Sequence, residues 1–134
     1  MHKIIAIANQ KGGVGKTTTC VNLASYLALM GKKVLAVDID PQGNCSSGFG
    51  VDKTKVKYST YSVLSGETDA KNAIIPTLVK NLDIMPSNID LAGAEVELVG
   101  VEDREKVLKK VLSPLRNSYD YILIDCPPSL ALLT

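Results

Sequence analysis

Residues 10–19 read QKGGVGKTTT, and this stretch decides the fold. It follows the apolar segment Lys3–Ala8 and leads into a segment whose apolar residues recur at helical spacing. Glycines let backbone N–H groups turn inward around a phosphate, and the start of a helix adds positive potential. Lys16 can neutralise phosphate charge, and the Thr17 hydroxyl can ligate magnesium. The stretch predicts a phosphate-binding loop between a strand and a helix.

The strict pattern for such a loop, G-x-x-x-x-G-K-[ST], is not met, because Gln10 occupies the place of its first glycine. The alternative interpretation is a glycine-rich turn that contains a lysine by chance. We favour the phosphate loop, because an apolar segment precedes it, a helical pattern follows it, and two acidic segments come later in the chain.

The first acidic segment, residues 38–44, reads DIDPQGN and follows an apolar run. Asp38 and Asp40 are two positions apart, so their side chains point the same way while the chain stays extended. They could orient a water molecule or help to hold magnesium beside a γ-phosphate. The alternative, which we weigh about equally for this segment alone, is ordinary turn chemistry.

The second acidic segment ends an apolar run at Asp125. A carboxylate at the end of a buried strand carries a desolvation cost that a cation would offset. Close to a phosphate loop, we expect that cation to be magnesium, held mostly through water. The alternative is an aspartate that caps the next turn.

Three segments are nearly continuous in Ile, Val, Leu and Ala, namely Lys3–Ala8, 33–39 and 121–124. Strands covered on both faces show this pattern, so we expect buried strands in a mainly parallel sheet. Residues Leu82–Met85 predict another strand. The alternation of strands with helices predicts an α/β fold whose ligand chemistry lies at the carboxyl ends of the strands.

Helices are predicted over residues 16–30, where Gly31 offers a stop, and over 102–112. Residues 87–90 resemble a capping box, which predicts a further short helix ending at Gly100. No apolar run approaches the roughly 20 residues that span a bilayer.

Composition indicates one globular domain: 134 residues, 46% hydrophobic, 22% charged, with a net charge of +1. This charge gives no global reason to expect binding to nucleic acid or to an anionic membrane. The cysteines Cys20, Cys45 and Cys126 are odd in number and form no CxxC pair, so they indicate neither a disulfide framework nor a zinc site. We expect a reducing, cytoplasmic compartment.

The segments 11–17 (KGGVGKT), 38–44 (DIDPQGN) and 124–129 (IDCPPS) together resemble the ParA/Soj family of bacterial partition ATPases, over the whole chain. A lysine at the position of Lys11 characterises that family's deviant Walker A loop. This resemblance explains why the strict phosphate-loop pattern is not met. The resemblance implies a P-loop NTPase-like fold, with a mainly parallel sheet flanked by helices. It also implies that residues 1–134 are the N-terminal part of a single P-loop ATPase domain that is incomplete at its C-terminal side.

The resemblance implies roles for individual residues. Lys11 would reach across a nucleotide-sandwich dimer to the partner's nucleotide, Asp40 would position the attacking water, and Asp38 would support the switch segment. The catalytic set would be Lys11, Lys16 and Asp40, and the metal set Thr17, Asp40 and Asp125. The nucleotide would be bound by Lys11, Gly12, Gly13, Val14, Gly15, Lys16, Thr17 and Thr18.

By the same resemblance, we expect a magnesium-dependent ATPase of chromosome or plasmid partitioning, with ATP and Mg²⁺ as cofactors. In the full-length protein we expect ATP-dependent homodimerisation, a ParB-type partner, and non-specific DNA binding through a C-terminal half. That protein would be cytoplasmic and nucleoid-associated, without membrane binding. Two alternatives are a non-catalytic nucleotide-binding regulatory module and a MinD-type cell-division ATPase. Cys126 directly follows Asp125 without a second suitable cysteine, so we interpret it as structural rather than as an iron–sulfur ligand.

Overall fold

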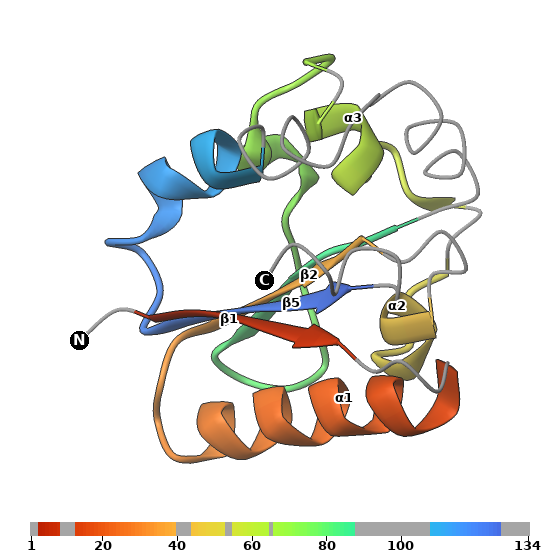
Figure 1. Cartoon of the computed structure of the whole chain (residues 1–134), viewed down its shortest axis with the longest axis vertical. Coiled ribbons are helices and arrows are strands. Elements are labelled where there is room, and N and C mark those ends of the chain that lie inside the picture. The colour runs from red at the N-terminus through yellow and green to blue at the C-terminus, as the bar shows by residue number, and fades with distance from the viewer. Residues whose placement is uncertain are drawn as a thin grey trace.

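The fold is that of a computed structural model, which describes residues 3–8, 13–39, 44–52, 55–64, 66–87 and 108–126. Its centre is a five-stranded sheet in the order β1-β5-β2-β4-β3 (Figure 1). All neighbouring strands run parallel except β3, which pairs antiparallel with β4. The strands are β1 (Lys3–Ala8), β2 (Val34–Asp38), β3 (Ile75–Pro76), β4 (Leu82–Met85) and β5 (Tyr121–Cys126).

Helices cover both faces of this sheet (Figure 1). The long helix α1 (Gly13–Leu29) runs along one face, and α2 (Asn44–Gly48) packs beside it. The other face carries α3 (Thr60–Leu64) and the helical residues 108–112, which continue into the 3₁₀ helix η3 (Ser113–Leu115). A second 3₁₀ helix, η2 (Ala70–Ala73), contacts α3. The α/β fold with a mainly parallel sheet flanked by helices is therefore confirmed.

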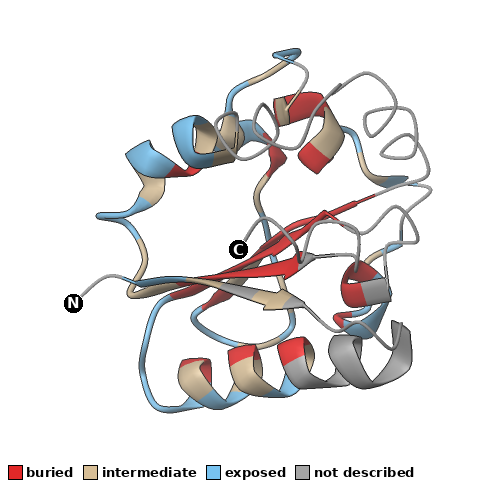
Figure 2. Cartoon of the chain, in the orientation of Figure 1, coloured by how far each residue is buried: buried red, intermediate tan, exposed pale blue. Residues whose placement is uncertain are grey.

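Two apolar cores separate these layers, because successive strand residues point to opposite faces. In β2, Val34 and Ala36 pack toward α1, whereas Leu35 and Val37 pack toward α3 and η3. All five residues of β2 are fully buried, as Figure 2 shows for the centre of the sheet. The sequence expectation of a strand covered on both faces is confirmed for β2.

The expectation of a buried strand is wrong for β1. Ile5 and Ile7 pack against the core beneath α1, but Ile4, on the other face, is 43% exposed. The reason is topological, since among the described strands β1 pairs with β5 alone and forms one edge of the sheet. A run of apolar residues does not distinguish an edge position from a central one.

The predicted helix over 16–30 is present, but it begins at Gly13, three positions earlier, and ends at Leu29. The first helical turn needs no intrahelical partner for its N–H groups, so the glycines of the loop are tolerated within it. Gly31 supplies the predicted stop, with a φ of +87°. The helix expected up to Gly100 and the start of the one expected at 102–112 lie outside the described residues, whereas 108–112 are helical. No described helix is long and apolar enough to cross a membrane.

Candidate functional site

Two aspartates lie side by side at the carboxyl edge of the sheet. In the parallel pairing of β2 with β5, Asp38 is in register with Asp125, and both residues are completely buried. On the other side of β5, Asp125 is in register with Ile7 of β1. The strand β1 runs toward α1, whose first residue is Gly13, so the start of α1 belongs to the same edge. The topology therefore brings the two predicted acidic strand ends together with the predicted phosphate loop's helix.

Asp38 is held by a buried hydrogen-bond network. Its Oδ2 accepts from the backbone N–H of Ser46 at 2.8 Å and from the Ser46 hydroxyl at 2.7 Å. The same hydroxyl accepts from the backbone N–H of Ser87 at 2.9 Å. Ser46 and Ser87 are both completely buried. The network connects the end of β2 to α2 and to the segment after β4, so Asp38 orients structure around the site as well as contributing charge.

The Asp125 carboxylate, next to Asp38, fits a hard divalent cation. The backbone N–H of Ile39 donates to the Asp125 carbonyl at 3.2 Å, which keeps the two strand ends together beyond the last paired residues. Carboxylate oxygens are the ligands that Mg²⁺ prefers in proteins. Two adjacent buried carboxylates also repel each other, and a cation bound at this edge would offset that repulsion. The donor set at this edge therefore suits magnesium.

The structure places the other predicted site residues only in part. Gly13, Val14, Gly15, Lys16, Thr17 and Thr18 form the first turns of α1, and their backbone alone is described. Lys11, Gly12 and Asp40 lie outside the described residues, and so does the side chain of Cys126. The geometry of the site thus rests on Asp38 and Asp125 and on the position of α1.

Sequence reasoning missed four residues next to this edge: Cys20, Cys45, Ser46 and Ser87. The Cys45 and Cys20 sulfurs are 3.7 Å apart, and both residues are completely buried. The contact with Cys20 raises the pKa of the Cys45 thiol, as do burial and the charges of Asp38 and Asp125. These contacts join separate elements, so no local sequence pattern predicts them. Of the four residues, only Ser87 is part of such a pattern, as a possible helix cap. Within the described part of the chain, no three His, Cys, Asp or Glu residues form a further metal cluster.

A mainly parallel sheet with a glycine-rich helix start after one strand, and with acidic residues ending its neighbours, defines a class of nucleotide-binding α/β proteins. The family model described as an AAA domain matches residues 2–134, and the chain belongs to that family. The P-loop NTPase-like fold expected from the motifs is thereby confirmed.

The chain is also similar in sequence to Soj proteins, which are named as sporulation and chromosome-partitioning proteins. It is 58% identical to the sporulation initiation inhibitor protein Soj of Bacillus subtilis, and the match covers 100% of this chain and 53% of the relative. It is 52% identical to the chromosome-partitioning ATPase Soj of Treponema pallidum, covering 100% of this chain and 52% of the relative. The chain therefore spans about half the length of the curated relatives it matches.

A solved structure shows the same fold with nucleotide. Cobyrinic acid a,c-diamide synthase from Mycobacterium smegmatis, with bound ADP and magnesium, superimposes with a TM-score of 0.90 at 42% identity. That match covers 99% of this chain and 55% of the synthase chain. The resemblance to the ParA/Soj family deduced from the three motifs is confirmed by these relatives.

Proposed function

We propose that residues 1–134 form the N-terminal part of a single P-loop domain that binds ATP with Mg²⁺ and hydrolyses it in chromosome or plasmid partitioning. The observation that carries this proposal is the register of Asp38 with Asp125, two buried carboxylates at the edge where β1 leads to α1. The names of the relatives and the nucleotide in the synthase structure support the same activity. They also favour partitioning over the cell-division alternative.

The proposed roles follow the chemistry of each side chain. Lys16 and the N–H groups of Gly12, Gly13, Val14 and Gly15 bind the phosphates, with Thr18 close by. Thr17, Asp40 and Asp125 bind Mg²⁺, which supplies charge neutralisation at the phosphates. Asp40 also orients the attacking water, and Asp38 holds α2 in place by accepting hydrogen bonds from Ser46.

For the whole protein we propose a nucleotide-sandwich homodimer in which Lys11 contacts the partner's nucleotide, as an arginine finger contacts a transferring phosphoryl group. A ParB-type partner and non-specific DNA complete the proposed cycle. The second candidate is a module that binds nucleotide without hydrolysing it, since a phosphate loop and two buried carboxylates also suit a binding protein.

Binding and turnover separate these two candidates. We expect isothermal titration to show binding of ATP with Mg²⁺ to the purified chain, and phosphate release to show turnover. Lys16→Ala removes the cation at the phosphates and abolishes binding, whereas Asp40→Ala keeps binding and loses turnover. Lys32→Ala is the matched control, because Lys32 is exposed beyond the far end of α1.

Each outcome of these binding and turnover measurements supports or contradicts one part of the proposal. Binding without turnover in the parent chain supports the non-catalytic module. Equal turnover in Asp40→Ala and the parent contradicts the role of Asp40, and tight binding by a folded Lys16→Ala chain contradicts the phosphate loop.

A further inference from the structure

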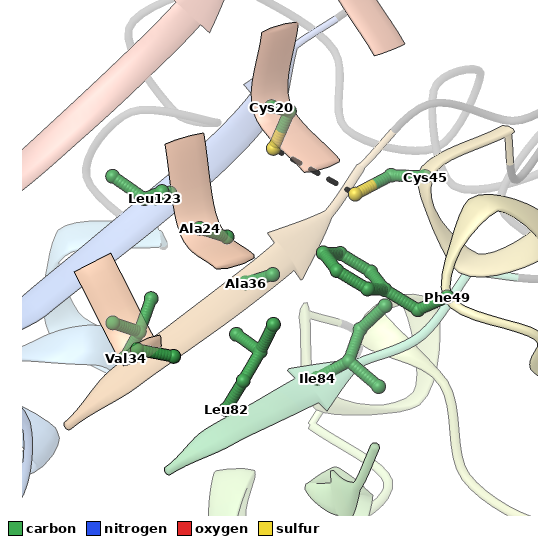
Figure 3. Close-up of a cluster of buried hydrophobic side chains, with 10 residues drawn as sticks. Cys20, Ala24, Val34, Ala36, Cys45, Phe49, Leu82, Ile84 and Leu123 are labelled. Atoms are coloured by element: carbon green, nitrogen blue, oxygen red, sulfur yellow. Dashed lines mark hydrogen bonds between the residues drawn. The ribbon is translucent and has the colours of Figure 1, made fainter. Parts of the chain in front are cut away.

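Two buried thiols face each other between the first helix and the segment that follows Asp38. Cys20 lies on α1 and Cys45 on α2, and Figure 3 shows their sulfurs pointing toward one another at 3.7 Å. The two residues are 25 positions apart in the sequence, both are free cysteines, and both are completely buried. A disulfide has an S–S length of about 2.05 Å, so bond formation requires the sulfurs to approach by about 1.7 Å.

The surroundings of the pair make it a junction between elements. Cys20 belongs to the apolar core under α1, together with Ala24, Phe49 and Ile84 (Figure 3). Cys45 directly precedes Ser46, whose backbone and hydroxyl both hold Asp38. A bond between the sulfurs would thus fix α2, and with it the Asp38 network, to the helix that begins at the phosphate loop.

We propose that Cys20 and Cys45 form a reversible disulfide with a small disulfide oxidant, which fastens α2 to α1. One cysteine thiolate attacks the glutathione disulfide, which releases one glutathione and leaves a mixed disulfide on the protein. The second cysteine attacks the protein sulfur of that mixed disulfide and releases the second glutathione. The cysteines together lose two electrons and two protons, and the two glutathione thiols gain them.

Burial determines how fast this exchange runs. The attacking species is the thiolate, and burial, the Cys20 contact and the nearby carboxylates raise the pKa of Cys45 above that of an ordinary thiol. A closed contact between α1 and α2 also keeps glutathione out. Exchange therefore proceeds through transient opening of α2, a helix of five residues, and closure places the second sulfur for the final step. This inference is independent of the proposed ATPase activity.

Peptide mapping tests the pairing directly. The purified chain is incubated with oxidised glutathione in native buffer, quenched in acid, unfolded, alkylated with N-ethylmaleimide and digested. We expect the peptide that links Cys20 to Cys45 to account for most of the protein disulfide, and dithiothreitol to restore both thiols. Cys126→Ser retains the link, whereas Cys20→Ser and Cys45→Ser each lose it.

Oxidation of the unfolded chain in urea provides the reference for pairing without structure. If the three possible pairings occur in the same proportions in urea and in native buffer, the folded geometry does not direct the bond and the proposal is overturned. Alkylation of both Cys20 and Cys45 after prolonged native oxidation also overturns it. Hydrogen exchange adds a second readout, since slower exchange of the α2 amides after oxidation is expected only if the bond fastens α2.

Discussion

At the scale of single residues, the Ser46 hydroxyl connects two other segments of the chain through two buried hydrogen bonds. It donates to the Asp38 carboxylate and accepts from the Ser87 backbone in a region with no exposed surface. Buried polar groups depend on such partners, because bulk water cannot reach the site to replace a lost hydrogen bond. The position of the Asp38 carboxylate is therefore set by a residue on another element.

Ser46→Ala removes both of those hydrogen bonds at once. The Ser87 N–H loses this acceptor, and Asp38 keeps the Ser46 backbone N–H but loses the hydroxyl. We expect the free energy of unfolding to fall by about 1–3 kcal/mol, the usual cost of removing a partner from a buried polar group. Urea denaturation followed by circular dichroism measures the change.

The neighbouring Ser47→Ala is the matched control, because Ser47 is exposed on the same short helix. Its free energy of unfolding should stay within about 0.5 kcal/mol of the parent. Equal values for the two variants would show that the buried network contributes nothing to stability.

At the scale of elements, the end of α1 is defined by hydrogen bonds around Gly31. The Lys32 N–H donates to the Leu27 carbonyl at 3.1 Å, and the Gly31 N–H donates to the Ala28 carbonyl at 3.0 Å. This pair of bonds is the Schellman arrangement, which places a residue of positive φ just past the helix. Gly31 has that conformation, and it allows the chain to turn into β2 directly after α1.

Gly31→Ala should destabilise the protein through backbone conformation alone. A Cβ at this position would meet no atom within 4 Å, so the cost comes from the φ of +87° rather than from a clash. We expect a loss of about 1–2 kcal/mol in the free energy of unfolding. Gly31→Asn should cost less, because asparagine adopts positive φ more readily. Chemical denaturation of both variants checks the order, and an equal loss in the two would refute the conformational explanation.

The sequence predicts the elements whose patterns are long or strongly apolar. It finds β1, β2, β4 and β5, because each is a strongly apolar run, and it finds α1, whose apolar residues recur at helical spacing up to a stop at Gly31. It does not find α2 or α3, since five residues are too few to show helical periodicity, nor the two-residue strand β3. Short elements depend on tertiary contacts. One example is the hydrogen bond of 3.1 Å that the Thr60 hydroxyl of α3 donates to the Met85 carbonyl of β4.

For the candidate site, too, the sequence predicts one part and misses another. Asp38 and Asp125 could be predicted because each ends an apolar strand, and parallel strands bring their ends to one edge. The Cys20–Cys45 contact and the role of Ser46 could not, since they arise where α2 packs against α1 and β2. The proposed roles of Lys11, Lys16, Thr17 and Asp40 remain predictions of sequence and family.

At the scale of the whole molecule, the two edges of the described sheet differ. The edge at β3 is two residues long and contains Pro76, which has no N–H to donate. The edge at β1 is six residues long and exposes Ile4. A long apolar edge is a site where a second chain can add a strand.

We expect the nucleotide-free chain to self-associate with rising concentration through β1. A charge on the edge opposes strand addition, so Ile4→Lys should shift association to higher concentration. Sedimentation velocity over a concentration series measures this. Leu78→Lys is the control. Leu78 is 97% exposed, but it lies between β3 and β4 and not on the β1 edge. The edge explanation fails if the parent chain stays monomeric throughout or if both lysine variants behave alike.

The pairing of β1 with β5 also fixes an order of events during synthesis. Lys3 lies in register with Tyr121, so the first strand to leave the ribosome pairs with the last described one. The chain must emerge as far as Tyr121 before β1 can pair with β5, whereas β2 and β4 can pair much earlier. Contacts so distant in sequence close slowly. A nascent chain of this protein therefore displays an apolar N-terminal segment until β5 has emerged, and chaperones that act at the ribosome exit can bind such a segment during that time.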